Sequence, residues 1–324
     1  MENLNTTIRP YDPQRDEEQV YELWQRTLGQ AWPLSQATFH YVTIGSTAYQ
    51  PGDHVVAQMG QEVVGFVGGQ AWLVPGASAP RGELMAVMVD PGYQRQGIGR
   101  ALLERALDML RTRGIDSVQL GGGGMSYFWP GVPLNLPGAW PFFEACGWVE
   151  AERSFDLVQD LSDYATPPGV YERIRLPGVT ITTAVPGDAA QVLAFEAQHF
   201  PEWLPFYQRV LERGGHADVV LARHTEYGIV GVSGVVHPRA AWQSHDSLWE
   251  QLLGKDVGGV GPLGVAEDWR ENGIGLALAA RVTELLRERG ARTAYVGWTW
   301  LVNWYGKLGY HIWQEYVMSW ARVS

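Results

Sequence analysis

Apolar residues recur along the chain with two different periods, and these periods predict the order of strands and helices. Residues 99–114 and 275–290 carry apolar side chains at helical spacing, so each segment predicts an amphipathic helix. Both segments end in an arginine-rich turn and then Gly114 or Gly290, which is typical of a helix C-terminus. Pairs of β-branched runs separated by a turn precede each helix and predict strand hairpins. These runs are residues 54–59 with 62–74, and 218–224 with 227–236.

The predicted elements repeat, so the two halves of the chain share one order of strands and helices. Residues 6–24 and 179–198 each predict a strand, a turn and a helix, with Asp16 and Asp188 at matching points near the helix start. Each half continues with the hairpin, a third strand, the amphipathic helix, another strand and an aromatic-rich segment. The order β-α-β-β-β-α-β-α, with a final strand, predicts an α/β (α+β) fold. We expect two tandem domains, each a mixed, mostly antiparallel sheet flanked by helices.

Proline and glycine residues separate the two halves. Thr166-Pro167-Pro168-Gly169 and Leu176-Pro177-Gly178 mark a linker. We therefore predict an N-terminal domain over residues 1–160, a linker over 161–178 and a C-terminal domain over 179–324. The length of 324 residues agrees with two domains of ordinary size.

Composition narrows the class of protein. Apolar residues make up 46% of the chain and charged residues 18%, as in ordinary globular proteins. The net charge of −11 argues against sequence-independent nucleic-acid binding, because an acidic surface repels phosphates. The single cysteine, Cys146, excludes an internal disulfide, and the histidines lack metal-ligand spacing. Since signal-peptide and membrane-span patterns are missing, we expect a cytoplasmic monomer or homodimer that binds neither nucleic acid, membrane nor metal.

Two further features leave their role open. The first half has an extra stretch over residues 121–137, rich in glycine and proline, which predicts either a simple connection or a lid over a substrate. Tryptophans are numerous, and they either line substrate pockets or pack in the core. Those nearest the expected site are Trp129, Trp140, Trp298, Trp300 and Trp304.

Two glycine-bearing turns join a predicted strand to each amphipathic helix. They read Gln94-Arg95-Gln96-Gly97-Ile98-Gly99 and Arg270-Glu271-Asn272-Gly273-Ile274-Gly275. The first amides of a helix have no intrahelical partner and the helix dipole is positive there, so such a turn can hold a phosphate. Glycines let the backbone approach the anion, and Arg95 and Arg100 add positive charge.

The turns resemble the acetyl-CoA loop of the GCN5-related N-acetyltransferase (GNAT) superfamily, whose pattern is V-x-x-x-x-[QR]-x-x-G-x-[GA]. Val89 and Val265 begin the two matches. The order of strands and helices also agrees over most of both halves, as in tandem members of that superfamily. The resemblance implies acetyl-CoA (CoA) as cofactor, held by strand backbone and by the amides of each turn. The implied cofactor-binding residues are Val87, Met88, Val89, Gln94, Arg95, Gln96, Gly97, Ile98, Gly99, Arg100, Leu263, Gly264, Val265, Arg270, Glu271, Asn272, Gly273, Ile274, Gly275 and Leu276. A bulge in that strand would splay it from the next and open a cleft.

Two residues are candidates for acid and base catalysis. Glu83 lies eleven residues before Gln94, the distance of the catalytic glutamate in histone-acetylating members, so it is either a general base or a strand-end carboxylate facing solvent. Gly259 stands at that position in the second half. Tyr305, in a segment similar to the family's Y-x-K-x-G-F, either protonates the leaving thiolate or packs under the last strand. Phe143 is its counterpart in the first half and has no hydroxyl.

The combined features predict an acyl-CoA-dependent N-acyltransferase. We expect transfer of acetyl from acetyl-CoA to a primary amine of a small molecule or peptide by direct attack. The alternative is an acetyl-CoA-binding sensor or scaffold in which one or both domains are catalytically inactive.

Overall fold

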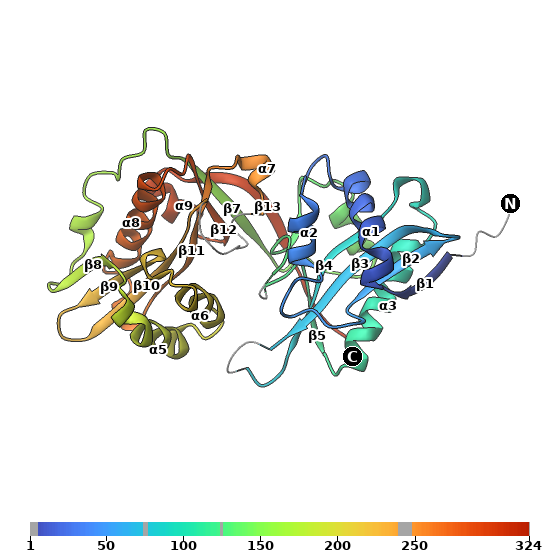
Figure 1. Ribbon diagram of the computed structural model, residues 1–324, viewed down its shortest axis with the longest axis horizontal. Helices are drawn as coiled ribbons and strands as arrows, with labels where there is room; N and C mark the ends of the chain where they lie inside the picture. Colours follow the sequence, from blue (N-terminus) through green and yellow to red (C-terminus); the bar gives the residue numbers. More distant parts are fainter. Residues whose placement is uncertain (1–5, 74–76, 124–125, 239–247, 324) are drawn as a thin grey trace. The chain divides into compact units, whose positions relative to one another are not determined.

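The computed structural model describes residues 6–73, 77–123, 126–238 and 248–323, and the chain forms two compact units (Figure 1). Unit 1 comprises residues 1–154 together with 315–324, and unit 2 comprises residues 155–314. Each unit contains one set of the repeated elements, so the predicted mixed α/β tandem fold is confirmed.

Unit 1 is built on a sheet of order β1-β2-β3-β4-β5-β14. Neighbouring strands are antiparallel except β4 and β5, which are parallel. Its strands are β1 (Thr6–Pro10), β2 (His54–Met59), β3 (Glu62–Trp72), β4 (Arg81–Val89), β5 (Ser117–Leu120) and β14 (Trp320–Arg322). The short β6 (Val132–Pro133) is not part of this sheet and pairs with β13. Its helices are α1 (Pro13–Thr27), α2 (Gln36–Val42), α3 (Ile98–Thr112) and α4 (Ala139–Ala145), with a 3-10 turn η1 (Pro91–Tyr93).

Unit 2 repeats this plan, with a sheet order β8-β9-β10-β11-β12-β7 in which only β11 and β12 are parallel within the described pairs. Its strands are β8 (Val179–Thr183), β9 (Val219–His224), β10 (Gly228–Val236), β11 (Val257–Val265) and β12 (Thr293–Thr299). Its helices are α5 (Ala189–His199), α6 (Leu204–Glu212), α7 (Glu250–Leu253), α8 (Ile274–Glu288) and α9 (Val302–Tyr305). Its 3-10 turns are η2 (Tyr171–Arg173), η3 (Pro186–Asp188), η4 (His216–Asp218), η6 (Glu267–Trp269) and η7 (Gly306–Leu308).

The units differ from the predicted consecutive domains at the last strand of each half. Strand β7 (Glu152–Asp160) follows the first repeat, yet its residues 155–160 pair with β12 of unit 2. Strand β13 (His311–Met318) ends in unit 1, where Tyr316 and Val317 pair with β6, and β14 pairs with β5. The units therefore do not coincide with the expected domains 1–160 and 179–324, and residues 161–178, the expected linker, fall within unit 2. The expected domain boundaries stay a prediction. A strand pattern predicts a strand but not the sheet edge that it joins, because pairing is non-local.

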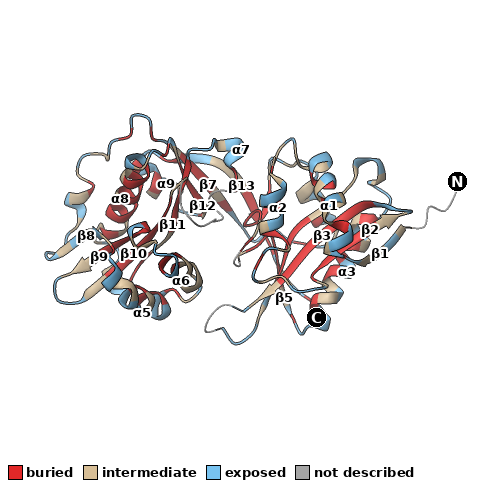
Figure 2. Ribbon diagram, in the orientation of Figure 1, coloured by how far each residue is buried: buried red, intermediate tan, exposed pale blue. Residues whose placement is uncertain are grey.

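Each sheet carries the repeat's long helix on one face, as the apolar stripes predict. In unit 1, Leu102, Leu103 and Ala106 of α3 are buried against β2, β3 and β4. In unit 2, the apolar face of α8 packs in the same way, and α5 and α6 form a second core with β9 and β10. Figure 2 shows this burial along the sheets and the inner faces of the helices. Within the described residues, no helix has the length and apolar character needed to cross a membrane.

The extra stretch over residues 121–137 contributes to the core of unit 1. Phe128 and Trp129 are buried, and their rings lie 4.5 Å and 5.4 Å from that of Trp24 on α1. Residues 124–125 of the stretch lie outside the described residues. The stretch therefore fills space beneath α1 rather than remaining a free connection.

Candidate functional site

In each unit, two neighbouring parallel strands pair briefly and then separate. In unit 1 the pairing of β4 with β5 covers only Gly82–Leu84 and Val118–Leu120, and β4 then continues to Val89 paired with β3 but not with β5. In unit 2 the pairing of β11 with β12 ends at Gly259 and Tyr295, and β11 continues to Val265. A strand that leaves its neighbour exposes backbone groups along one edge. Each unit therefore offers an unpaired strand edge that leads to the following turn.

A bulge accompanies each separation. The β3–β4 ladder shifts register between Gly68 and Gly69, where β4 holds one extra residue, Met85. The β10–β11 ladder shifts between Ser233 and Val235, where β11 holds the extra residue. Because a bulge bends its strand and increases the local twist, it turns the strand away from its neighbour. The bulge expected from the family resemblance is thus confirmed in both units.

The two phosphate turns have the same backbone conformation. We call residues 94–100 turn 1 and residues 270–276 turn 2. Arg95 and Glu271 both have φ of 63°, and Gly97 and Gly273 have φ of 87° and 82°. Left-handed φ is uncommon for residues other than glycine, and its recurrence at matching positions marks a required shape. Alternation of left- and right-handed residues directs several amides toward one side, which suits an anion.

The residue that opens each turn binds the end of the preceding strand. Gln94 Nε2 donates to Val89 O at 2.9 Å, and Arg270 Nε donates to Val265 O at 3.0 Å. A glutamine and an arginine therefore hold the same carbonyl in the two units. The family pattern allows either residue at this position, and the shared hydrogen bond gives the physical reason.

The last glycine of each turn makes room for an aromatic ring. A Cβ atom at Gly99 would lie 3.1 Å from the ring of Phe142, and one at Gly275 would lie 3.3 Å from Trp304. These rings come from α4 and α9, the short helices after the separated strands. Close packing therefore explains this glycine as well as the approach of an anion does.

Unit 1 has a cavity of about 760 Å³ that runs from turn 1 along β4. Most of its wall is apolar, and it extends past Leu120 and Gly121 to Trp129. The basic side chains on it are Arg95 and Arg100. Arg100 donates to the carbonyl of Ala145 at 2.9 Å, which ties α3 to the end of α4.

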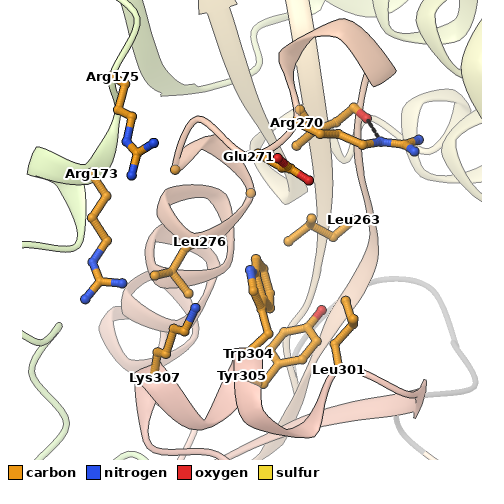
Figure 3. Close-up of a pocket in the computed structure, with 13 residues that line it drawn as sticks. Arg173, Arg175, Leu263, Arg270, Glu271, Leu276, Leu301, Trp304, Tyr305 and Lys307 are labelled. Atoms are coloured by element: carbon orange, nitrogen blue, oxygen red, sulfur yellow. Dashed lines mark hydrogen bonds between the residues drawn. The ribbon is translucent and has the colours of Figure 1, made fainter.

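Unit 2 has a cavity of about 640 Å³ between turn 2, β11 and α9 (Figure 3). Leu263 and Val265 form its strand wall, and Trp304 and Tyr305 line the opposite side. Its wall holds four basic residues and a single acidic one, Glu271. The basic residues are Arg173, Arg175, Arg270 and Lys307.

Most of the expected cofactor-binding residues line these cavities. Five of them do not line a cavity: Gln96, Ile98, Gly264, Asn272 and Ile274. The catalytic candidate Glu83 also lies outside the cavity lining. Ile98 and Ile274 are buried under the helix start, and Gly264 turns toward Phe200 on the other face of the sheet. Side-chain direction alternates along a strand and rotates along a helix, so only some residues of a motif face one cavity.

Tyr305 lies where an acid is expected. It belongs to α9, is 7% exposed, and lines the unit 2 cavity beside Leu301. In Figure 3 its hydroxyl points toward the strand wall at Leu263. The structure therefore brings Tyr305 and the strand of turn 2 to one cavity, and its role as an acid stays a prediction.

Glu83 is buried in unit 1 and held by several donors. Its carboxylate accepts hydrogen bonds from Gln70 Nε2 at 2.5 Å, Trp72 Nε1 at 2.6 Å and the amide of Gly123 at 2.8 Å. Its side chain is 1% exposed, so the solvent-facing alternative is wrong. These bonds tie β3 and β4 to the glycine-rich stretch. Its assignment as a general base remains a prediction.

Several residues at the unit 2 cavity were missed by sequence reasoning. Arg173 and Arg175 come from the expected linker, where no motif marks them, and only their charge in an acidic chain was a signal. Trp298, named in the sequence analysis, lies near the end of β12 outside the cavity lining; it has φ of 47°, and its amide donates to the buried carboxylate of Asp156 at 2.8 Å. Left-handed φ at a bulky residue can be recognised only in the structure.

Comparison with known proteins supports the assignment of the fold. Residues 17–148 match the model of the acetyltransferase (GNAT) family. The chain is similar to a GCN5-related glucosamine N-acetyltransferase region of a fungal multi-domain GH3 β-N-acetylglucosaminidase, with a TM-score of 0.89 and 30% identity. That match covers 99% of this chain and 38% of the other.

Two more comparisons concern the tandem arrangement. A mycothiol acetyltransferase of Cellulomonas flavigena is 27% identical over 74% of this chain and 64% of its own length. A tandem GNAT protein from the clavulanic acid biosynthesis pathway matches 99% of both chains with a TM-score of 0.63 and 18% identity, which shows a shared fold. The chain thus spans less than two thirds of the glucosamine and mycothiol relatives. Residues 17–148 therefore form a domain of the GNAT family, and the chain as a whole is similar to tandem two-domain GNAT proteins.

Proposed function

We propose that the protein is an N-acyltransferase that moves an acetyl group from acetyl-CoA to a primary amine. The observation that carries the proposal is the pair of turns with matching left-handed residues, each opening on a cavity beside an unpaired strand edge. Such a turn presents unpaired amides to a pyrophosphate, and a free strand edge can hydrogen bond to the amides of a pantetheine arm. An apolar wall along the strand suits the rest of that arm.

The chain's own residues would orient the reacting groups. Bound acetyl-CoA would supply the acyl group as a thioester. The amine nitrogen would form a bond to the acyl carbon as the carbon–sulfur bond breaks, and the proton lost by the nitrogen would pass to solvent. In unit 2 the hydroxyl of Tyr305, a residue that lines the cavity, would donate a proton to the leaving sulfur, whereas Phe143 in unit 1 lacks that hydroxyl. We therefore assign acid catalysis to unit 2.

For the acceptor we place the amine of an amino sugar first. Support comes from the glucosamine N-acetyltransferase region, which resembles this chain over 99% of its length at 30% identity. A peptide N-terminus or another small amine is the alternative acceptor.

An assay with acetyl-CoA and a panel of amines tests the proposal. The panel contains glucosamine, N-acetylglucosamine as a blocked control, simple alkylamines and a peptide with a free N-terminus. We expect thiol release that depends on glucosamine, with N-acetylglucosamine inactive and the acetylated product visible by mass spectrometry. Tight CoA binding without release on any amine would instead support a sensor or scaffold. Release with peptides alone would remove the amino-sugar assignment but keep the reaction class.

A further inference from the structure

The second turn differs from the first in what covers it. A segment of unit 2, residues 170–176, lies against turn 2, and we call it the linker segment. Arg175 N donates to Asn272 O at 3.1 Å, and a Cβ atom at Gly273 would lie only 2.2 Å from Arg173 O. A Cβ atom at Gly97 in turn 1 would meet no atom within 4 Å. Within the described residues, turn 2 thus contacts another backbone segment at its first glycine, whereas turn 1 does not.

Buried apolar side chains and a hydrogen bond to α8 hold the linker segment in place. Val170 is 3% exposed, and the hydroxyl of Tyr171 donates to Glu284 on α8 at 2.9 Å. Ile174 and Leu176 pack against the core beneath α8. Arg173 and Arg175 alternate in sequence with these two apolar residues; both arginines are exposed and line the cavity at turn 2 (Figure 3). Anchoring of the apolar side chains thus directs the arginines to the cavity.

These cations are not neutralised within the unit. Among the described residues, the side chains of Arg173, Arg175 and Lys307 have no hydrogen bond or ion pair. Many other arginines of this acidic chain are paired, such as Arg281 with Glu284 and Glu288. Unpaired cations around a cavity that also contains free helix amides create a positive potential that favours an anionic ligand.

We propose that Arg173 and Arg175 complete a phosphate-binding site in unit 2, so that the linker segment and turn 2 together bind the phosphates of CoA. This inference rests on the proposed function, because the ligand is the same. Guanidinium groups form charge-assisted, often bidentate hydrogen bonds with phosphates, and these are stronger than bonds between neutral groups. Unit 2 then depends on the linker segment for CoA affinity, and unit 1 does not.

Titration calorimetry with CoA and with pantetheine, which has no phosphate, tests the inference. The Gly97→Trp change blocks turn 1, so that the remaining binding belongs to unit 2. In that background, Arg173→Gln with Arg175→Gln should weaken CoA binding by about tenfold or more and leave pantetheine unchanged. Arg213→Gln, an exposed arginine of unit 2 away from the cavity, is the matched control and should have no effect. Lysine at both positions should retain part of the affinity.

Three outcomes separate this inference from the proposed function. Unchanged CoA affinity in the double glutamine variant would overturn the inference. Loss of all CoA binding in Gly97→Trp, while the wild type binds CoA and acetylates an amine, would also overturn it but leave the proposed function intact. A wild type that neither binds CoA nor transfers acetyl would reject the proposed function itself. Unchanged melting temperatures in the arginine variants exclude unfolding as the cause.

Discussion

Turn 1 and turn 2 have one backbone shape in two different surroundings. Both place a non-glycine residue at φ of 63° and a glycine at φ above 80°, and both hold the preceding strand by a side-chain hydrogen bond. Turn 1 is open at its first glycine, whereas the linker segment lies against Gly273 of turn 2. The conformation of a turn is set by local residues, but its ligand affinity depends on what packs around it.

The equivalent helices α1 and α5 also share one backbone structure but differ in the side chain that they bury at one matching position. Counted from Asp16 and Asp188, Trp24 in unit 1 corresponds to Glu196 in unit 2. Trp24 is buried and donates to the carbonyl of Trp32 at 2.8 Å. Glu196 is equally buried, but within the described part of the chain neither carboxylate oxygen has a hydrogen-bond partner. Repeated elements can therefore keep their fold while one copy carries an uncompensated polar group.

The largest expected effect comes from removing the chain end that unit 1 uses. Deletion of residues 315–324 removes Tyr316, Val317 and Met318, which are fully buried, and takes β14 away from β5. Each such side chain contributes about 2–5 kcal/mol, so we expect unit 1 to lose cooperative folding while unit 2 keeps much of its structure. Hydrogen exchange should show lost protection in β4 and retained protection in α8. Equal loss of protection in β4 and α8 would contradict this division of the chain.

The glycine pair provides the next test. Alanine at Gly97 must adopt left-handed φ, which costs about 1 kcal/mol. Alanine at Gly273 has that cost and also collides with Arg173 O, so we expect a loss of about 2–4 kcal/mol in unit 2. Chemical denaturation of the two variants measures the difference. Equal destabilisation would mean that the linker segment moves aside freely.

Tyr305→Phe tests the division of catalysis between the units. Loss of a general acid lowers turnover by about a hundredfold or more, and CoA affinity should stay the same. The matched control is Tyr310→Phe, which removes a buried hydroxyl bonded to Thr283 outside the cavity and should leave turnover unchanged. Steady-state kinetics with acetyl-CoA and the preferred amine measure both. Full activity of Tyr305→Phe would remove this residue from the mechanism.

The smallest effect concerns Glu196 and depends on pH. Burial raises the pKa of this carboxyl from 4.5 to about 9, with a further contribution from the charge of Glu202. The folded state therefore holds a proton that the unfolded state releases above about pH 4.5, and stability falls as pH rises from there toward 9. Glu196→Gln removes this dependence and should stabilise unit 2 by about 1–3 kcal/mol at pH 8.

Thermal unfolding at pH 5 and pH 8 measures the Glu196 effect. The gain in Glu196→Gln should be larger at pH 8 than at pH 5, where the unfolded carboxyl is partly protonated. Glu202→Gln, an exposed neighbour, is the control and should change the pH dependence only slightly. A gain that is the same at both pH values would contradict the raised pKa.

Local patterns were enough to predict the repeat and both turns, the family resemblance added the bulged strands, and the role of Tyr305 stays a prediction. Apolar periodicity, the position of glycines and the short motifs depend on residues close together in the chain, where steric and hydrogen-bond preferences act directly. The same reasoning placed Glu83 near the turn-1 strand but did not find Gln70, Trp72 and Gly123, which bind its carboxylate. Those donors come from a neighbouring strand and a distant stretch.

Other features depended on contacts between segments far apart in the sequence. The exchange of final strands, the contact between Arg173 and Gly273, and the burial of Glu196 all arise from such contacts. A strand has hydrogen-bonding backbone groups on both edges, so its sequence does not specify which strand it pairs with. A flexible arginine side chain can bind any nearby anion, so its position in the sequence does not specify its ligand. Tertiary packing decided which partner each of these groups has, because it brings together groups that are far apart in the sequence.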